Sequence, residues 1–131
     1  MIDSFVKFKT AGGSGDVIIG AGSQINSGCV LYSRNGIRIG ANVLIAANCT
    51  FAPTNHAYQD RNRLVREQRF LPSKGGIELG DDVWVGCNCV FLDGAKVGSG
   101  AIIGAGSLVR GSVEPYTVVA GSPLRIIGRR Q

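Results

Sequence analysis

Large apolar side chains recur every six residues along most of this chain. The first positions of the repeat are Ile19, Ile25, Leu31, Ile39, Ile45, Phe51, Leu79, Val85, Phe91, Val97, Ile103 and Val109. An α-helix repeats every 3.6 residues and a half-buried strand every two, so neither produces this spacing. A longer fixed period is typical of a solenoid, in which short strands alternate with tight corners.

The fourth and fifth positions of the repeat support this interpretation. Nine of the twelve fourth positions are Gly, Asn or Asp, the residues that tolerate the left-handed backbone of a corner. These nine are Gly22, Gly28, Asn42, Asn48, Asp82, Asn88, Gly94, Gly100 and Gly106. The fifth positions are mostly small, as a narrow interior between converging strands requires. We therefore predict an all-β fold, a parallel β-helix of triangular section.

Grouping the repeats by three predicts about four turns in a single domain, 1–131. The coil would cover 19–114, with an extruded loop at 57–76 and a tail at 115–131. A short insertion (Ile37–Arg38) and the long one (Ala57–Glu78) both follow a third repeat, so we expect both at one corner. In the tail, Ser122 followed by Pro123 predicts the start of a short helix through Ile127.

Composition narrows the function classes. With 44% hydrophobic residues and a mean hydropathy of +0.16, the chain is expected to fold. It has no apolar run of the roughly 18 residues that span a membrane and no leader pattern, so we expect a cytoplasmic protein without a membrane span. The net charge of +5 favours an anionic partner. We expect no nucleic-acid binding, because no basic helix or aromatic RNA-binding motif occurs.

The cysteines predict packing rather than chemistry. Cys29, Cys49 and Cys89 share the fifth position of successive turns and should stack inside the coil as reduced thiols. Cys87 and Cys89 form Cys-x-Cys rather than Cys-x-x-Cys, and the chain has one histidine. We therefore expect no metal site.

The outward sixth positions include several large apolar residues. They are Val30, Leu44, Trp84, Val90, Ile102 and Leu108. This is more apolar surface than a small monomer usually exposes, so we expect self-association. A three-sided prism favours a cyclic homotrimer.

The carboxy-terminal block carries a family resemblance. "IELGDDVWVGCNCVFLDGAKVGSGAIIGAGSLVRGSVEPYTVVAGSPLRIIG" resembles the block shared by maltose, galactoside, xenobiotic and polysaccharide O-acetyltransferases. "NH" before the long insertion and "GGI" after it are similar to the sugar O-acetyltransferase branch. Over about 17–130, the chain resembles the hexapeptide-repeat acyltransferases with a left-handed β-helix. Because the amino-terminal helical segment of the larger enzymes is missing, we expect the cell-surface polysaccharide or lipopolysaccharide group.

This resemblance implies transfer of an acetyl group from acetyl-coenzyme A to a sugar hydroxyl, at a site between subunits of a trimer. The repeat already places His56, the only histidine, outward at the last coil position before the long insertion. The resemblance implies that His56 is the general base and that the backbone amide of Cys87 binds the oxyanion. A Cys87 thiol nucleophile is the competing interpretation.

The resemblance also implies binding residues. Asn48 would bind acceptor hydroxyls, or serve only as a corner residue, and Trp84 would line the site or pack across the trimer interface. For coenzyme A, the matching positions are Ala105, Gly106, Arg110, Pro123 and Arg125. Relatives often carry a lysine where this chain has Gly111, so Arg110 or Arg125 would supply the phosphate contact.

Other interpretations stay open at this point. The acceptor could be the nitrogen of an amino sugar, a xenobiotic or serine, and a non-catalytic β-helix scaffold is the alternative of another class. A γ-type carbonic anhydrase would need three histidines, and the chain has one. The arginine-rich stretch 60–69 could clamp an anionic acceptor, or could be an ordinary solvated loop.

Overall fold

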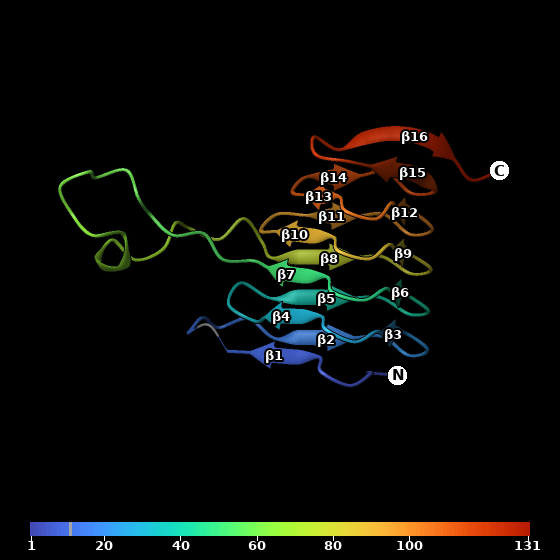
Figure 1. Ribbon diagram of the computed structural model, residues 1–131, viewed down its shortest axis with the longest axis horizontal. Helices are drawn as coiled ribbons and strands as arrows, with labels where there is room; N and C mark the ends of the chain where they lie inside the picture. The colour runs from blue at the N-terminus through green and yellow to red at the C-terminus, as the bar shows by residue number, and fades with distance from the viewer. Residues whose placement is uncertain (11) are drawn as a thin grey trace.

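Three β-sheets wind around a common axis in the computed structural model, which describes residues 1–10 and 12–131 (Figure 1). Sheet A contains β3 (Gln24–Ile25), β6 (Leu44–Ile45), β9 (Trp84–Val85), β12 (Ile102–Ile103), β15 (Thr117–Ala120) and β16 (Arg125–Arg129). Sheet B contains β1 (Lys7–Lys9), β4 (Val30–Tyr32), β7 (Thr50–Ala52), β10 (Val90–Leu92) and β13 (Leu108–Val109). Sheet C contains β2 (Val17–Ile19), β5 (Ile37–Ile39), β8 (Ile77–Leu79), β11 (Lys96–Val97) and β14 (Ser112–Val113). The chain passes from sheet C to A to B, and we name the corners by the sheets they join.

The interior follows the six-residue repeat. First-position residues of successive turns pair in register, as Ile45 does with Val85 and Phe51 with Phe91. The two phenylalanine rings stack with centroids 4.6 Å apart and planes 2° from parallel. Eleven of the twelve first positions are buried, and Ile19 is half-buried. The predicted all-β, parallel β-helix is therefore confirmed.

The corners also behave as predicted. All nine Gly, Asn and Asp residues at fourth positions have positive φ, from 54° at Asp82 to 90° at Gly94. Asparagine and aspartate adopt this conformation more readily than other residues with a side chain because their short polar groups bond locally. Local backbone preference therefore sets where the coil turns.

The coil is longer than the predicted four turns. It has five to six strands per sheet, because β1 and a bridge between Ile2 and Ile25 precede the predicted start and β15 follows the predicted end. These turns were missed because their spacing departs from six. Seven residues separate β1 from β2, and only Arg110 and Gly111 separate β13 from β14.

The predicted helix through Ile127 is wrong. Residues 125–129 form β16, which runs antiparallel to β15. The coil ends at β15, whose outer edge would otherwise leave N–H and C=O groups unpaired, and a returning strand with two isoleucines pairs that edge. The described residues include one short helix, the 3-10 turn η1 (Val65–Glu67), and no helix among them is long and apolar enough to cross a bilayer.

Insertions gather at the B–C corner, as predicted. Residues 53–76, between β7 and β8, extend away from the coil as a long loop (Figure 1, green). The shorter insertion lies at the same corner, although Ile37 and Arg38 belong to β5 and the extra residues fall in the turn before it. Sheets A and B keep their register across the loop, since β7 still pairs with β10 and β6 with β9.

Candidate functional site

The long loop narrows at its root and fixes the only histidine there. His56 and Phe70 form an antiparallel bridge, flanked by hydrogen bonds from Ala57 N to Arg69 O (2.9 Å) and from Leu71 N to Asn55 O (2.8 Å). The His56 and Phe70 rings lie 4.7 Å apart, and the His56 side chain is exposed. The predicted outward position of His56 is therefore correct.

A buried carboxylate anchors the returning end of this loop. Asp93, only 3% exposed, accepts hydrogen bonds from the backbone N–H groups of Lys74 (2.7 Å) and Gly76 (2.8 Å) and from the Asn35 side chain (3.2 Å). These contacts join the end of the loop to the B–C corner of two coil turns. Asp93 therefore supports the segment that carries His56.

We expect Asp93→Ala to lower the free energy of unfolding by about 1–3 kcal/mol, because it leaves the buried Gly76 N–H without an acceptor. Urea denaturation at a fixed protein concentration measures this loss. Asp81→Ala is the matched control, because the Asp81 carboxylate also accepts a backbone N–H, from Ala41 at 2.8 Å, but at an exposed position. Equal losses in both variants would contradict the anchoring role.

The A–B corner brings four predicted residues together. Asn48, Cys87 and Ala105 occupy this corner in successive turns, and Gly106 N donates to Cys87 O at 2.9 Å. All four residues are exposed. Gly106 has φ of +72° and nothing within 4 Å of where a Cβ would stand, so a ligand can approach the backbone closely.

Several backbone N–H groups at the A–B corner make no hydrogen bond within the described residues. Within the described residues, the N–H groups of Ala47, Cys87 and Ala105 have no hydrogen-bond acceptor. At the C–A corner, by contrast, Ala41 N donates to the Asp81 carboxylate and Asp81 N to the Ser99 hydroxyl. The A–B corner therefore presents a column of N–H groups available to an anionic or carbonyl oxygen.

Trp84 lies on the outer face of sheet A, next to this corner. Its side chain is 54% exposed, and it is in register with Leu44 below and Ile102 above. The outer face of sheet C differs, since it carries Arg38 and the Lys96–Glu78 ion pair at 3.4 Å. Leu44 and Trp84 thus form an exposed apolar surface on sheet A, whereas on sheet C the exposed Ile18 lies next to charged side chains.

The residues predicted for coenzyme A are divided, because Ala105 and Gly106 lie at the A–B corner and the other three lie away from it. Arg110 and Pro123 line one cavity of about 550 Å³, together with Gly111. Arg125 does not reach it and lines a smaller neighbouring cavity of about 230 Å³. Ala105 lies in neither cavity.

One chain does not bring the whole predicted site together. His56 follows β7 and lies at the B–C corner, whereas Asn48 and Cys87 lie at the A–B corner, so sheet B separates them. A base and an oxyanion donor on opposite edges of one sheet cannot act on the same atom. Either the two groups serve different sites or a second chain completes each one.

Comparison with known proteins identifies the family to which the six-residue repeat is similar. The family described as bacterial transferase hexapeptide (six repeats) matches residues 76–111. The chain is a hexapeptide-repeat protein. Over 98% of its length it superimposes on a Vibrio cholerae hexapeptide-repeat acetyltransferase solved with acetyl coenzyme A, with a TM-score of 0.81, 27% identity and 67% of that chain covered.

Curated relatives of this hexapeptide-repeat chain include two from Escherichia coli. Galactoside O-acetyltransferase is 34% identical over 86% of the chain. A putative lipopolysaccharide biosynthesis O-acetyl transferase, WbbJ, is 31% identical over 88% of the chain. The chain spans 53% and 61% of the lengths of these two relatives.

The cysteine column of the repeat is confirmed. Cys29, Cys49 and Cys89 are fully buried, and each thiol donates to a carbonyl oxygen at 3.2 Å. The neighbouring thiols of Cys29 and Cys89, followed by burial, raise the pKa of the Cys49 thiol. Cys87, in contrast, is exposed.

We expect Ellman's reagent to modify Cys87 rapidly in the native protein and the other three thiols only after unfolding, because attack requires an accessible thiolate. Absorbance of the released thionitrobenzoate counts the reactive groups. Cys87→Ser should remove the fast phase. A fast phase that survives this substitution would contradict the buried column.

Sequence reasoning missed three residues around the loop. Phe70 contacts His56, and the Arg34 guanidinium carbon lies 3.3 Å from the centroid of the Phe70 ring. The sequence does contain an indication of Arg34, because it is an exception at the fourth position of the repeat, where nine of twelve residues are Gly, Asn or Asp. Asp93 left a weaker one, as a carboxylate directly after the apolar run "VFL".

Proposed function

We propose that this protein is an acetyltransferase that moves the acetyl group of acetyl-coenzyme A to a hydroxyl of a saccharide acceptor in cell-surface polysaccharide or lipopolysaccharide synthesis. The observation that carries the proposal is that the chain has both an exposed histidine at a loop root and backbone N–H donors without acceptors at a corner of the coil. The Vibrio cholerae acetyltransferase bound to acetyl coenzyme A and the two O-acetyltransferase relatives support it.

His56 is the general base of the proposed reaction. A sugar hydroxyl is almost wholly protonated at neutral pH, and a neutral imidazole can accept its proton as the oxygen attacks the thioester carbonyl carbon. A new C–O bond forms, the C–S bond breaks, and the proton passes from the imidazolium to the departing thiolate. The transfer is direct and forms no acyl-enzyme.

The Cys87 amide supplies the electrostatic part. The tetrahedral intermediate carries a negative oxygen, which a fixed N–H donor stabilises more strongly than the ground-state carbonyl. Cys87 N–H has no acceptor in the described part of the chain and is therefore free to make this bond. Asn48 binds acceptor hydroxyls, and Trp84 packs beside them.

Acetyl-coenzyme A binds as the co-substrate. Ala105 and Gly106 hydrogen-bond and accommodate the pantetheine arm, while Arg110 and Pro123 bind near the adenine and phosphates. The open space beside Gly106 and the cavity shared by Arg110 and Pro123 suit these roles. Arg125, in a separate cavity, is the weaker phosphate ligand.

The active form is a homotrimer with sites between subunits. Leu44 and Trp84 are 46% and 54% exposed on sheet A, and covering such side chains stabilises association. Association also offers a way to bring His56 of one chain to the Cys87 corner of the next.

A thiol-release assay with acetyl-coenzyme A and a panel of saccharides tests the proposal. We expect acceptor-dependent release of coenzyme A and a product ester that hydroxylamine cleaves. An amide product, which resists hydroxylamine, would replace the O-acetyl assignment with N-acetylation. No release above background with any acceptor would argue for a non-catalytic scaffold.

A further inference from the structure

A cavity beside His56 is lined by three arginines. It has a volume of about 520 Å³ and is lined by Gly12, Arg34, His56, Arg66, Arg69 and Phe70. This volume lies within the roughly 300–1,000 Å³ of typical small-molecule sites. No carboxylate is among its lining residues in the described part of the chain. The cavity therefore joins the proposed base to a local excess of positive charge.

The fold of the loop puts these arginines there. Arg66 lies in η1, and Arg69 precedes Phe70, which pairs with His56. Arg69 holds φ at +64°, a conformation that is uncommon for a residue with a side chain. Arg34 comes from the coil and stacks on Phe70. Residues from two separate segments thus converge on one cavity.

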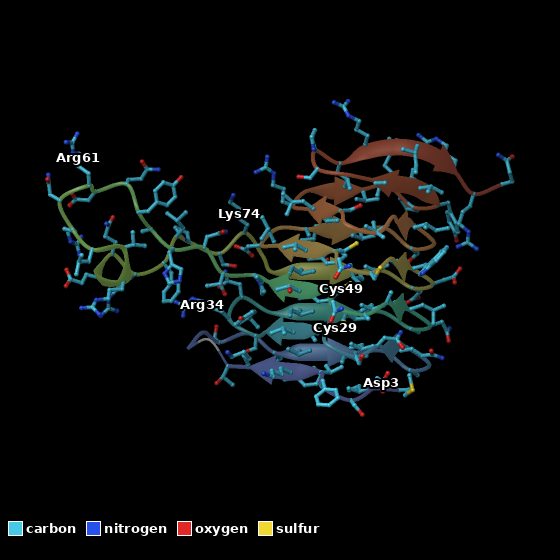
Figure 2. The ribbon with its side chains drawn as sticks, viewed as in Figure 1. Asp3, Cys29, Arg34, Cys49, Arg61 and Lys74 are labelled. Atoms are coloured by element: carbon cyan, nitrogen blue, oxygen red, sulfur yellow. The ribbon has the colours of Figure 1, made fainter. Side chains whose placement is uncertain are left out.

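The other two loop arginines lie outside the cavity. Arg63 Nη2 donates to Glu67 O at 3.0 Å and so ties the loop together. Arg61 lies at the far end of the loop, whereas Arg34 lies where the loop leaves the coil (Figure 2). Of the four loop arginines, Arg66 and Arg69 therefore line the cavity, whereas Arg61 and Arg63 do not.

We infer that the acceptor carries an anionic group, a carboxylate or a phosphate, which Arg66 and Arg69 bind while His56 takes the proton of a nearby hydroxyl. This inference rests on the proposed function. A planar guanidinium binds both kinds of oxyanion through paired N–H donors, and the guanidinium groups of Arg66 and Arg69 would have no counterpart around a neutral acceptor. The acceptor is thus an acidic saccharide or a phosphorylated one.

Matched acceptor pairs test this inference by thiol release. Methyl glucuronide is compared with methyl glucoside, and glucose 1-phosphate with glucose, at constant ionic strength. We expect the wild type to prefer at least one anionic member by roughly 10- to 100-fold in kcat/KM. The pair that shows the preference identifies carboxylate or phosphate as the bound group.

Variants assign the preference to the cavity. Arg66→Gln and Arg69→Gln should remove it, Arg69→Lys should restore part of it, and Arg61→Gln is the matched control at the loop tip. Equal use of charged and neutral acceptors by the wild type would overturn the inference. A rise in KM for acetyl-coenzyme A, with the acceptor KM unchanged, would also overturn it, because the arginines would then bind the cofactor phosphates.

A second measurement separates this inference from the proposed function. If no acceptor is acetylated, the proposed function fails, and binding alone decides about the cavity. His56 is the only histidine, so its imidazole NMR signals report on this site. Glucuronide or glucose 1-phosphate should shift them in the wild type and far less in Arg69→Gln. Equal shifts in both proteins would overturn the anionic site.

Discussion

His56→Ala should reduce the rate of acetyl transfer roughly 10²- to 10⁴-fold, the usual contribution of a general base. The loss should appear in kcat, because the imidazole acts as the proton leaves the acceptor. The fold should persist, since His56 is exposed and its side chain makes no hydrogen bond within the described residues. Steady-state thiol release measures the rate, and circular dichroism the fold.

The control for His56→Ala is Arg61→Ala, a substitution on the same loop at its far end (Figure 2). It should leave kcat within about twofold, because surface changes away from a site have small effects. A His56→Ala enzyme that keeps wild-type kcat would remove the histidine from the mechanism. Unfolding of the loop in that variant would appear as faster proteolysis, which distinguishes a structural defect from a lost base.

Cys87→Pro should reduce kcat roughly 10²- to 10³-fold, the cost of removing one oxyanion donor. Proline has no N–H, so the substitution deletes the proposed donor itself rather than the thiol. The chain already contains a precedent, because Pro115 directly precedes the left-handed Tyr116 (φ 60°), just as Cys87 precedes Asn88 (φ 58°). Proline is therefore compatible with this type of corner.

Cys87→Ala is the matched control, because it removes the thiol and keeps the amide. Full activity in this variant, with a large loss in Cys87→Pro, would assign the role to the backbone. The reverse pattern, an inactive Cys87→Ala enzyme, would favour a thiol nucleophile. Ala47→Pro, one turn away at the same corner, tests whether any proline in this column lowers activity.

His56→Ala and Cys87→Pro together test whether active sites form between chains. Each should be inactive alone, one for lack of the base and the other for lack of the amide. Equimolar co-refolding should restore about a quarter of the wild-type activity, because half of the bases and half of the corners remain intact. No recovery would mean that both groups must come from one chain, which sheet B separates, and the proposed mechanism would fail.

The sequence predicted the parts of the fold that depend on local rules. Corner residues such as Asn42 and Gly106 have positive φ because backbone preference acts within one residue. Stacked interior residues such as Phe51 and Phe91 follow from a strict period. Where the period failed, at the seven-residue connection after β1 and the short corner before β14, the prediction failed with it.

The candidate site could be predicted only in part for a related reason. The outward position of His56 follows from the repeat, but its contact with Phe70 depends on how the loop folds back over fourteen residues. The Asp93 anchor and the Arg34–Phe70 stack also join residues far apart in the chain. No local pattern encodes such contacts. The C-terminal helix failed similarly, because the unpaired edge of β15 overrode the local helix signal.

Because the long loop lies at a single corner, mutations in it can change the specificity of the protein without disturbing the fold of the coil. Residues 53–76 can vary in length and charge while β7 stays paired with β10 and the stacked interior remains undisturbed. Within these residues, acceptor preference can diversify through substitutions around His56 without new strands, cores or subunit contacts having to arise. The coil thus stays constant, and the loop root, which Asp93 anchors, is where the acceptor preference of the proposed enzyme can change.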